Sequence, residues 1–351
     1  MDALSDVSKG DSGMLGKQSF QFTCKPYIIS SASIVGSKEA QGPMGKLFDK
    51  TGYDDMFGAQ NWEDAESSLQ KEALEIALSK AKLSKQDLQL VFAGDLLGQS
   101  IASSFGLAGY QVPHVGLYGA CSTCGLSLAM GGMAVAGAFV QKAACITSSH
   151  FASAEKEFRF PLAYGNQRPK SATWTVTGSG AFILSAQPGE QVCAVMEGVT
   201  IGKIVDYGIK DSMNMGACMA PAAADTIRQS LEDFGRAPKD YDKIITGDLG
   251  EVGQRLLFDL LSDMQIDITK QHMDCGIEIF ESKKQHTDAG GSGCGCSAVV
   301  LSAYILKKLQ EGVWKRVLFV PTGALLSKTS FNEGQTIPGI AHGVILEHYE
   351  G

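Results

Sequence analysis

The chain contains two copies of one residue pattern, and this internal duplication restricts the folds that it can adopt. The run LVFAGDLLGQS (residues 90–100) resembles IITGDLGEVGQ (residues 244–254), and Asp95 matches Asp248. In each copy a β-rich run meets Gly-Asp, which is typical of a strand that ends at a loop. A sequence that resembles itself in this way predicts two structural units of the same kind.

A second and longer pair of runs supports the duplication. Residues 119–150 (GACSTCGLSLAMGGMAVAGAFVQKAACITSSH) parallel residues 292–324 (SGCGCSAVVLSAYILKKLQEGVWKRVLFVPTGA), and Cys121 aligns with Cys294. The two pairs of runs are separated by different lengths of chain, so we expect an insertion in the second half. Each half reads strand, helix, strand, helix, which predicts a parallel sheet covered by helices.

The composition allows a large core and argues against a nucleic-acid partner. The 351 residues are 44% hydrophobic, which is enough for two domains or one two-lobed body. There are 30 basic and 38 acidic residues, and no long basic cluster occurs. Because nucleic-acid binding needs a basic surface, we expect no nucleic-acid partner. Nine cysteines without an apolar leader indicate a reducing compartment.

One uncharged stretch, residues 115–141, raises the question of a membrane span. Its most apolar part, LSLAMGGMAVAGAFV (residues 126–140), is shorter than the roughly 20 residues that a spanning helix needs. We therefore expect a buried central helix here. The first 17 residues, MDALSDVSKGDSGMLGK, are expected to form a disordered extension.

These features together resemble the thiolase superfamily, which includes thiolases, ketoacyl synthases and hydroxymethylglutaryl-CoA synthase. Two βα-type halves carry a cysteine at a strand-to-helix junction, and GSGAFILS (residues 178–185) is similar to the Gly-rich strand that ends the first half of ketoacyl synthases. The resemblance covers nearly all of the chain from about Gln18 onward. It implies a five-layered α/β fold, α/β/α/β/α, with pseudo-repeated halves over residues 18–188 and 189–351.

Eight further runs resemble a sporulation-specific branch of this superfamily in spore-forming Firmicutes. They are GPMGKLFDKTGYDDM (42–56), AGDLLGQ (93–99), GACST (119–123), TSSHFASAEKEFRFP (147–161), TVTGSGA (175–181), MAPAAADTI (219–227), AGGSGCGCSAVV (289–300) and TIPGIAHGV (336–344). This branch belongs to the SpoVA system, which moves dipicolinic acid into the developing spore.

The resemblance to this branch implies a ligand, partners and a location. The ligand would be dipicolinic acid, and the partners would be the membrane subunits of the SpoVA complex. Through these partners, a cytoplasmic protein would be attached peripherally to the inner membrane of the forespore and spore. Superfamily members also dimerise through an edge strand of the first half, which we expect near the runs TVTGSGA (175–181) and ACITSS (144–149).

Cys121 is the candidate nucleophile, but its usual partners are missing. A cysteine at a helix N-terminus has a lowered pKa, and condensing enzymes pair it with a His and an oxyanion hole. Ketoacyl synthases of the short type carry His-Gln-Ala-Asn after the first strand of the second half, where this chain has Asp248. The loop at residues 289–294 contains neither Asn nor His, and His342 replaces the cysteine of the thiolase Cys-x-Gly loop.

We therefore expect binding without catalysis, and two alternatives stay open. One is an acyl-transferring enzyme with Cys121 as nucleophile and His342 as base. The other is a structural subunit that scaffolds the channel complex and keeps only a vestigial pocket. Loss of the His and Asn partners argues against the enzyme, and retention of Cys121 argues against the scaffold.

Dipicolinate is planar and doubly anionic, so its site needs hydrogen-bond donors. Helix N-termini at Cys121 and at residues 292–294 would supply N–H groups. The two aspartates suit a calcium chelate better than a free dianion, because calcium prefers oxygen ligands; each could equally cap a turn. The residues expected to contact the ligand are Asp95, Gln99, Cys121, Ser122, Thr123, His150, Arg159, Asp248, Ser292, Cys294 and His342.

We expect no resident cofactor or metal, apart from calcium carried with the ligand. Cys121 and Cys124 have the spacing of a redox pair, and with Cys294 and Cys296 they could form a zinc site. We interpret them instead as small buried thiols that let two central helices pack closely.

Overall fold

The strands of the two predicted halves are arranged in the same order. The computed structural model describes residues 13–158 and 167–351. The order in the first half is β3 (Tyr27–Val35), β9 (Gly178–Ser185), β7 (Lys142–Ser149), β5 (Leu90–Gly94) and β6 (His114–Gly116). The order in the second half is β10 (Ala194–Thr200), β17 (Gly343–Glu347), β14 (Arg316–Val320), β11 (Lys243–Thr246) and β12 (His272–Asp274). The strands correspond one to one, as an internal duplication requires.

The sheet is parallel over most of each half, and one strand in each half departs from the prediction. β5 pairs in parallel with β6 and β7, and β11 pairs in parallel with β12 and β14. However, β9 and β17 are antiparallel to the strands beside them. The prediction of a parallel sheet is wrong at these two strands. After β7 and after β14, the chain returns to the sheet at the same end of the strands at which it left, so no crossover connection is made and β9 and β17 run in the opposite direction.

The two halves are joined edge to edge. Tyr27 and Ile28 of β3 pair with β10, so a single 13-stranded sheet runs through both halves and includes β1 (Met14–Leu15), β2 (Ser19–Gln21) and β4 (Lys50–Thr51). The outermost strand of the first half is β6. The runs at residues 144–149 and 175–181 lie in or next to β7 and β9, which are interior strands. The predicted position of the dimerising edge strand is therefore wrong.

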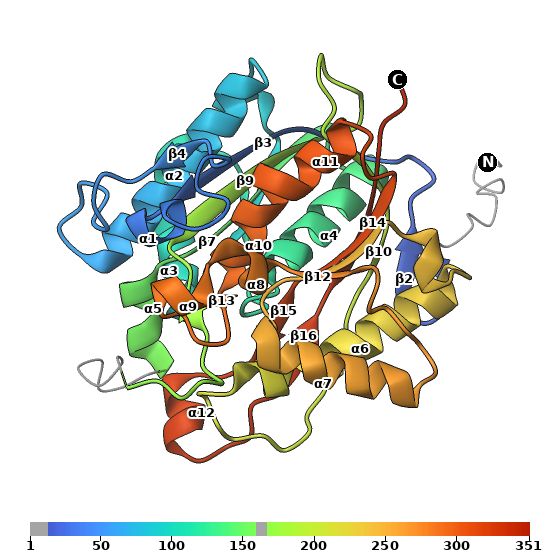
Figure 1. Cartoon of the computed structure of the whole chain (residues 1–351). Coiled ribbons are helices and arrows are strands. Elements are labelled where there is room, and N and C mark those ends of the chain that lie inside the picture. Colours follow the sequence, from blue (N-terminus) through green and yellow to red (C-terminus); the bar gives the residue numbers. More distant parts are fainter. Residues whose placement is uncertain (1–12, 159–166) are drawn as a thin grey trace, which may run out of the picture.

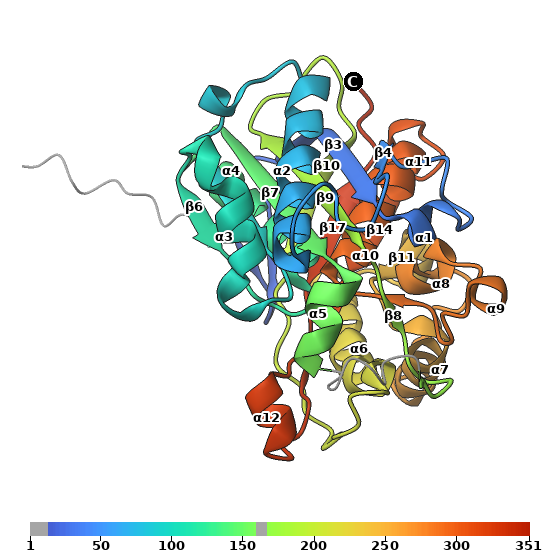
Figure 2. The ribbon, with the colours of Figure 1, turned by 90° about the vertical axis from the view of Figure 1, so that its left-hand side faces the viewer.

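Helices lie on both sides of the sheet in each half, which gives the five layers that the resemblance implied (Figures 1 and 2). α2 (Trp62–Lys80) and α3 (Ile101–Leu107) cover the first half, and α6 (Met215–Asp233) and α7 (Gly250–Asp263) cover the second. The middle layer contains α4 (Thr123–Ala136), α10 (Cys294–Val300) and α11 (Leu306–Gln310). The shorter elements are α1 (Ser37–Ala40), α5 (Phe151–Phe158), β8 (Trp174–Thr175), α8 (Cys275–Ile279), α9 (Ser282–Gln285), β13 (Gly291–Ser292), β15 (Thr322–Ala324), α12 (Lys328–Asn332) and β16 (Gly339–Ala341).

A π-helical turn reconciles the two copies of the central helix. The stretch from Cys121 to Lys142, where β7 begins, is one residue shorter than the stretch from Cys294 to Arg316, where β14 begins. Between α10 and α11 the chain forms a π-helix, Leu301–Ile305. A π-helical turn accommodates an extra residue in a helix. This supports the alignment of Cys121 with Cys294.

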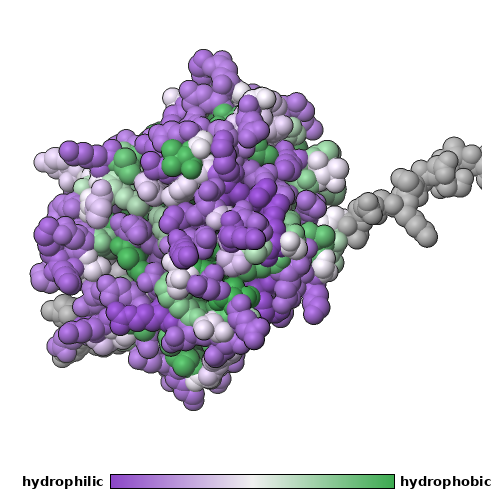
Figure 3. Space-filling model, turned by 45° about the vertical axis from the view of Figure 1, so that its right-hand side comes forward, coloured by the Kyte–Doolittle hydropathy of each residue, from purple (hydrophilic) through white to green (hydrophobic). Residues whose placement is uncertain are grey.

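α4 is the buried central helix that the uncharged stretch predicted. A Cβ atom at Gly131 would lie 2.5 Å from Sγ of Cys145 on β7, and one at Gly132 would lie 2.7 Å from Cε of Met196 on β10. The two glycines therefore let the strands of both halves approach the same helix. In the part of the chain that the structure describes, no helix is long and apolar enough to cross a membrane. Hydrophilic residues predominate on the face shown in Figure 3.

The folded chain begins earlier than predicted. Residues 1–12 of the expected disordered extension lie outside the described residues. Residues Met14 and Leu15, however, form β1 and pair with β2, and the backbone N–H of Lys17 donates to Asp233. The predicted boundary between residues 188 and 189 falls in the connection between β9 and β10.

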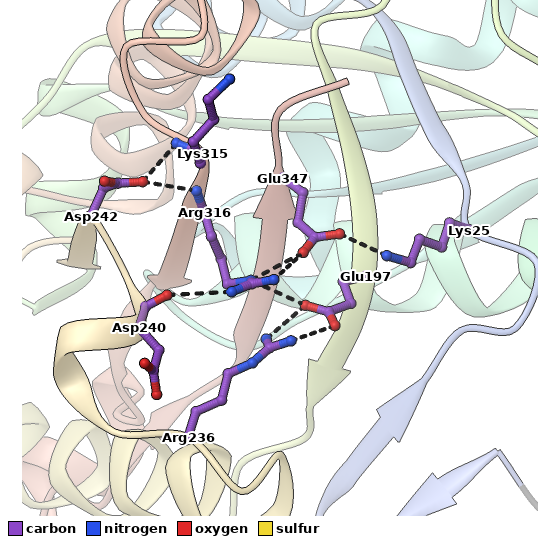
Figure 4. Close-up of polar contacts among 8 residues, drawn as sticks. All are labelled: Lys25, Glu197, Arg236, Asp240, Asp242, Lys315, Arg316 and Glu347. Atoms are coloured by element: carbon purple, nitrogen blue, oxygen red, sulfur yellow. Dashed lines mark hydrogen bonds and ion pairs between the residues drawn. The ribbon is translucent and has the colours of Figure 1, made fainter. Parts of the chain in front are cut away.

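An ion-pair network ties together three neighbouring strands of the second half and the segment before β3 (Figure 4). Arg236 donates to both carboxylate oxygens of Glu197, at 2.7 and 2.6 Å. Arg316 donates twice to Glu347, at 3.0 and 2.7 Å, and lies 3.6 Å from Glu197. Lys25 donates to Glu347 at 2.7 Å. Glu197 is buried, so its charge depends on these cations for compensation.

Candidate functional site

A pocket of about 300 Å³ opens beside Cys121, where segments of the two halves meet. We call its buried lining residues the floor: Leu97, Ser100, Ala120, Cys121, Thr175, Met215, Ser292 and Ala324. We call its exposed and half-buried lining residues the rim: Leu96, Gly98, Gln99, Tyr118, Glu157, Leu326, Ser327 and Lys328. The floor thus combines side chains from β8 and β13 with the segment before α4.

The surroundings of Cys121 favour its protonated thiol over the reactive thiolate. Cys121 lies two residues before α4, and its Sγ is 3.9 Å from Oγ of Ser292. Burial raises the pKa of Cys121 well above its ordinary value, and the negative charge of Asp248 raises it further. The expected lowering of the Cys121 pKa by a helix N-terminus is therefore outweighed. At neutral pH the floor presents a protonated thiol.

Asp248 organises the segments behind the floor. It accepts hydrogen bonds from Oγ of Ser292 at 2.9 Å, from the backbone N–H of Gly293 at 2.9 Å and from Oγ1 of Thr322 at 2.6 Å. Burial raises the pKa of Asp248, and these hydrogen bonds act in the opposite direction. The N–H group that we expected to bind an anion at the start of α10 is thus already bound by a carboxylate of the protein.

Thr175 belongs to the floor but was missed at the sequence level. Its Oγ1 donates to Oε1 of Glu155 at 2.9 Å. Glu155 is buried and forms an ion pair with Arg168, whose Nη2 lies 3.0 Å from Oε2. The Arg168 guanidinium lies 4.7 Å from the ring centre of Trp174. Glu155 and Thr175 both lie in runs that carried the family resemblance, but nothing in their spacing showed that they touch.

Several predicted ligand contacts hold the backbone instead. Asp95 accepts hydrogen bonds from the N–H groups of Leu97 and Ser103, at 2.9 and 2.8 Å, so it caps a turn. The hydroxyl of Ser122 donates to Gly119 O, and that of Thr123 donates to Ala120 O, both at 2.6 Å. None of these three side chains lines the pocket, and the capping interpretation of Asp95 is the one that the structure supports.

The two candidate histidines also point elsewhere. Nε2 of His150 donates to Asp55 O at 2.7 Å, and burial lowers the His150 pKa. Nδ1 of His342 accepts a hydrogen bond from the N–H of Gly202 at 3.3 Å, and burial lowers the His342 pKa to about 4. Neither histidine lines the pocket. No hydrogen bond to Cys121 from His342 occurs among the described residues, so the geometry gives no support to a Cys121–His342 pair.

The remaining predictions divide between the pocket and the core. Gln99 and Ser292 line the pocket together with Cys121. Cys294 lies in the core, where its thiol donates to Ser148 O at 2.9 Å. Arg159 lies outside the described residues. The nine cysteines are free, and the described ranges contain no group of three or more His, Cys, Asp or Glu side chains arranged to hold a metal.

The arrangement is better suited to binding than to acyl transfer. A nucleophilic thiol needs a base or a positive charge nearby to form the thiolate. Cys121 has instead a buried carboxylate behind it, which opposes ionisation. The pocket combines an enclosed floor with an exposed rim, as small-molecule sites do, and its volume lies at the small end of their range.

Comparison with known proteins identifies relatives along almost the whole chain. A family model for stage V sporulation protein AD matches residues 16–347. Stage V sporulation protein AD of Bacillus subtilis (strain 168) is 44% identical over 339 residues, which cover 96% of this chain and 99% of that protein.

Solved structures with the same fold include two condensing enzymes. 3-Oxoacyl-[acyl-carrier-protein] synthase III from Aquifex aeolicus VF5 has a TM-score of 0.55 at 13% identity, over 92% of this chain and 99% of that chain. Human mitochondrial 3-ketoacyl-CoA thiolase in complex with CoA has a TM-score of 0.54 at 14% identity, over 93% of this chain and 98% of that chain. These similarities confirm the predicted thiolase-like fold, and at such identities they carry no information about a reaction.

Proposed function

Because the chain belongs to the stage V sporulation protein AD family, we propose that it binds dipicolinic acid in the pocket beside Cys121 and supports its uptake into the developing spore. The proposal is for binding without chemical conversion. The observation that carries it is the position of Cys121, at the floor of an enclosed pocket but next to a buried carboxylate that keeps its thiol protonated.

The rim offers the donors that a diacid needs. Burial raises the pKa of Tyr118 to about 12, so its phenol keeps its proton at neutral pH and can donate to a carboxylate. Lys328 and the amide of Gln99 also lie on the rim. The floor is mostly apolar, which suits the flat faces of an aromatic ring.

Two other functions fit the same fold less well. An acyl-transferring enzyme would need Cys121 as a thiolate, and Asp248 opposes that state. A scaffold subunit would not require a pocket, yet here segments of both halves together enclose one. A stable acyl adduct on Cys121, seen by mass spectrometry after incubation with acyl-CoA, would favour the enzyme.

Calcium carried with the ligand would meet a different carboxylate from those expected. Asp95 and Asp248 are buried, already accept hydrogen bonds, and do not line the pocket. Glu157 is the carboxylate that lines the rim, so we propose that it would face a calcium–dipicolinate chelate.

Family membership and the resemblance of the sequence also support two proposals about partners. The protein would reach the inner membrane of the forespore through the membrane subunits of the SpoVA complex. It would also form a homodimer through β6, the outermost strand of the first half. Phe105 of α3, the α-helix that precedes β6 in the chain, is 66% exposed. Membranes from sporulating cells should retain the protein, and removal of the membrane subunits should release it.

Calorimetric titration of the purified protein tests the ligand. Dipicolinic acid should give saturable binding, measured with and without calcium. Isophthalic acid has the same two carboxylates without the ring nitrogen and should bind more weakly. Saturable binding of dipicolinic acid with discrimination against isophthalic acid would support the proposal, and no heat with either ligand would contradict it.

A further inference from the structure

Both hydroxyl groups that Ser292 and Thr175 bring to the floor donate their protons away from the pocket. Oγ of Ser292 donates to Oδ2 of Asp248 at 2.9 Å, and Oγ1 of Thr175 donates to Oε1 of Glu155 at 2.9 Å. A hydroxyl group has one proton and two lone pairs, so each oxygen has only lone pairs left for a ligand. Toward the pocket, these two groups act as hydrogen-bond acceptors.

The negative charge of Asp248, behind the floor, also disfavours a ligand carboxylate there. Burial raises the pKa of Asp248, but the three hydrogen bonds that it accepts, from Ser292, Gly293 and Thr322, favour its ionised form. It lies directly behind Ser292, and the Cys121 thiol lies 3.9 Å from the Ser292 oxygen. A ligand carboxylate pressed against Ser292 would therefore meet lone pairs in front and a negative charge behind them.

The rim differs from the floor. It carries three donors, the Tyr118 phenol, the Gln99 amide and the Lys328 ammonium, together with one carboxylate, Glu157. Gln99 and Lys328 are exposed and Tyr118 is 47% exposed, partly buried on its pocket side, so a carboxylate beside them keeps part of its hydration. Toward a ligand, the pocket thus offers three donors at its rim, and at its floor the acceptor oxygens of Ser292 and Thr175 beside the Cys121 thiol.

We propose that the floor selects a neutral hydrogen-bond donor and excludes a carboxylate, so that the anionic groups of the ligand stay at the rim. This inference rests on the proposed function and deepens it. It orients dipicolinic acid: the ring edge opposite the nitrogen enters first, toward Ser292 and Thr175, and the two carboxylates face Tyr118 and Lys328. Ser292 and Thr175 then determine specificity, and Asp248 and Glu155 position their protons.

Three ligands that differ only at ring position 4 test this orientation by calorimetric titration of the full-length chain in calcium-free buffer. Dipicolinic acid is the reference. Pyridine-2,4,6-tricarboxylic acid adds a carboxylate at position 4, and its 4-carboxamide adds a neutral amide of nearly the same size. We expect the carboxamide to bind at least as tightly as dipicolinic acid. The tricarboxylate should bind at least about tenfold more weakly than the carboxamide, because like charges oppose each other at the floor.

Variants separate this electrostatic effect from a general loss of structure. Asp248→Asn removes the charge behind Ser292 and should shrink the preference for the carboxamide over the tricarboxylate. Asp233→Asn is the control, because Asp233 also accepts hydrogen bonds from backbone N–H groups, those of Lys17 and Gln18, and none of these residues lines the pocket. It should leave the preference unchanged. If Asp248→Asn fails to fold, Ser292→Ala should weaken the carboxamide about two- to tenfold more than it weakens dipicolinic acid.

The outcomes distinguish this inference from the function on which it rests. If dipicolinic acid binds and the wild-type protein takes the tricarboxylate as tightly as the carboxamide, the orientation is wrong and the proposed function stands. If dipicolinic acid does not bind at all, both are overturned. A preference for the carboxamide that survives Asp248→Asn unchanged would also overturn the role given to Asp248.

Discussion

Asp95 and Asp248 occupy equivalent positions in the two halves, but they stabilise different parts of the molecule. Asp95 accepts hydrogen bonds from Leu97 and Ser103, all within the first half. Asp248 accepts hydrogen bonds from Ser292 and Thr322, which lie on two separate segments beside the pocket. After the duplication, one copy of the residue holds the turn that carries Leu97 to the pocket floor, and the other sets the charge behind that floor.

The negative charge of Asp248 should make Cys121 less reactive toward alkylation. Asp248→Asn should lower the Cys121 pKa, because it removes a negative charge that opposes the thiolate. Alkylation by iodoacetamide below that pKa should accelerate about tenfold for each unit by which the pKa falls. Mass spectrometry of the peptide that carries Cys121, over a range of pH, measures the rate. Asp233→Asn, at an aspartate that does not line the pocket, should leave the rate unchanged, and equal acceleration in both variants would contradict the role of Asp248.

His342 should make the folded state sensitive to acid. Burial lowers its pKa to about 4 from an ordinary value of 6.5. Between these values the unfolded chain binds a proton that the folded chain does not, so stability is present above pH 6.5 and is lost as the pH falls toward 4. His342→Asn should reduce this loss, by at most about 1.4 kcal/mol per pH unit, in urea denaturation at pH 4.5 to 7.

The control for this prediction is His286→Asn. His286 is exposed and has a φ of 54°, a conformation that Asn tolerates well. It should leave the pH dependence of stability as it is in the wild type. Parallel curves for the wild type and His342→Asn would show that His342 titrates alike in the folded and unfolded chains.

The fold could be predicted from the sequence because duplication and strand-to-helix junctions are local patterns. The runs around Asp95 and Asp248, and those around Cys121 and Cys294, were enough to give two halves and a central helix layer. The direction of β9 and β17 could not be predicted, because it depends on the end of the strands at which a long connection re-enters the sheet. The edge position of β6 depends in the same way on the order of all the strands.

The site was predicted less well than the fold, for a physical reason. The sequence predicts ligand contacts at the polar residues near Cys121, yet the hydroxyls of Ser122 and Thr123 donate to backbone carbonyls of their own turn. Such local hydrogen bonds compete with any ligand. Thr175 and Tyr118 reach the pocket through tertiary packing, and single-sequence reasoning has no signal for that.

The ion pair between Arg236 and Glu197 should contribute strongly to stability. Among the described residues, Arg236→Met would leave the buried Glu197 carboxylate with the more distant Arg316 as its ion-pair partner, and we expect a loss of about 3 kcal/mol in the free energy of unfolding. Replacing both partners, as Arg236→Met with Glu197→Gln, should cost less than the single change. Urea denaturation measures both. Lys82→Met, in the exposed pair with Glu190, should change stability by less than about 1 kcal/mol.

Gly131 should not tolerate even one added methyl group. Alanine is normally favoured over glycine within a helix by about 1 kcal/mol. At Gly131, however, the new Cβ would lie 2.5 Å from Sγ of Cys145, so Gly131→Ala should destabilise the protein by about 1–3 kcal/mol. Gly109→Ala is the control, because nothing lies within 4 Å of its added Cβ. A Gly131→Ala variant as stable as the wild type would mean that α4 is packed more loosely than described.

If the chain dimerises as proposed, a charge introduced at Phe105, on the α-helix that precedes β6 in the chain, should separate the subunits. Phe105 is 66% exposed on α3, and burial of its ring against a second copy would be reversed by Phe105→Glu, since the carboxylate would lose its hydration there. Light scattering over a range of concentrations should show a dimer for the wild type and a monomer for the variant. Val313→Glu, at a 58% exposed site in the second half, should remain dimeric. A wild-type chain that stays monomeric at every concentration would contradict the dimer, and a Phe105→Glu variant that still dimerises would exclude Phe105 from the interface.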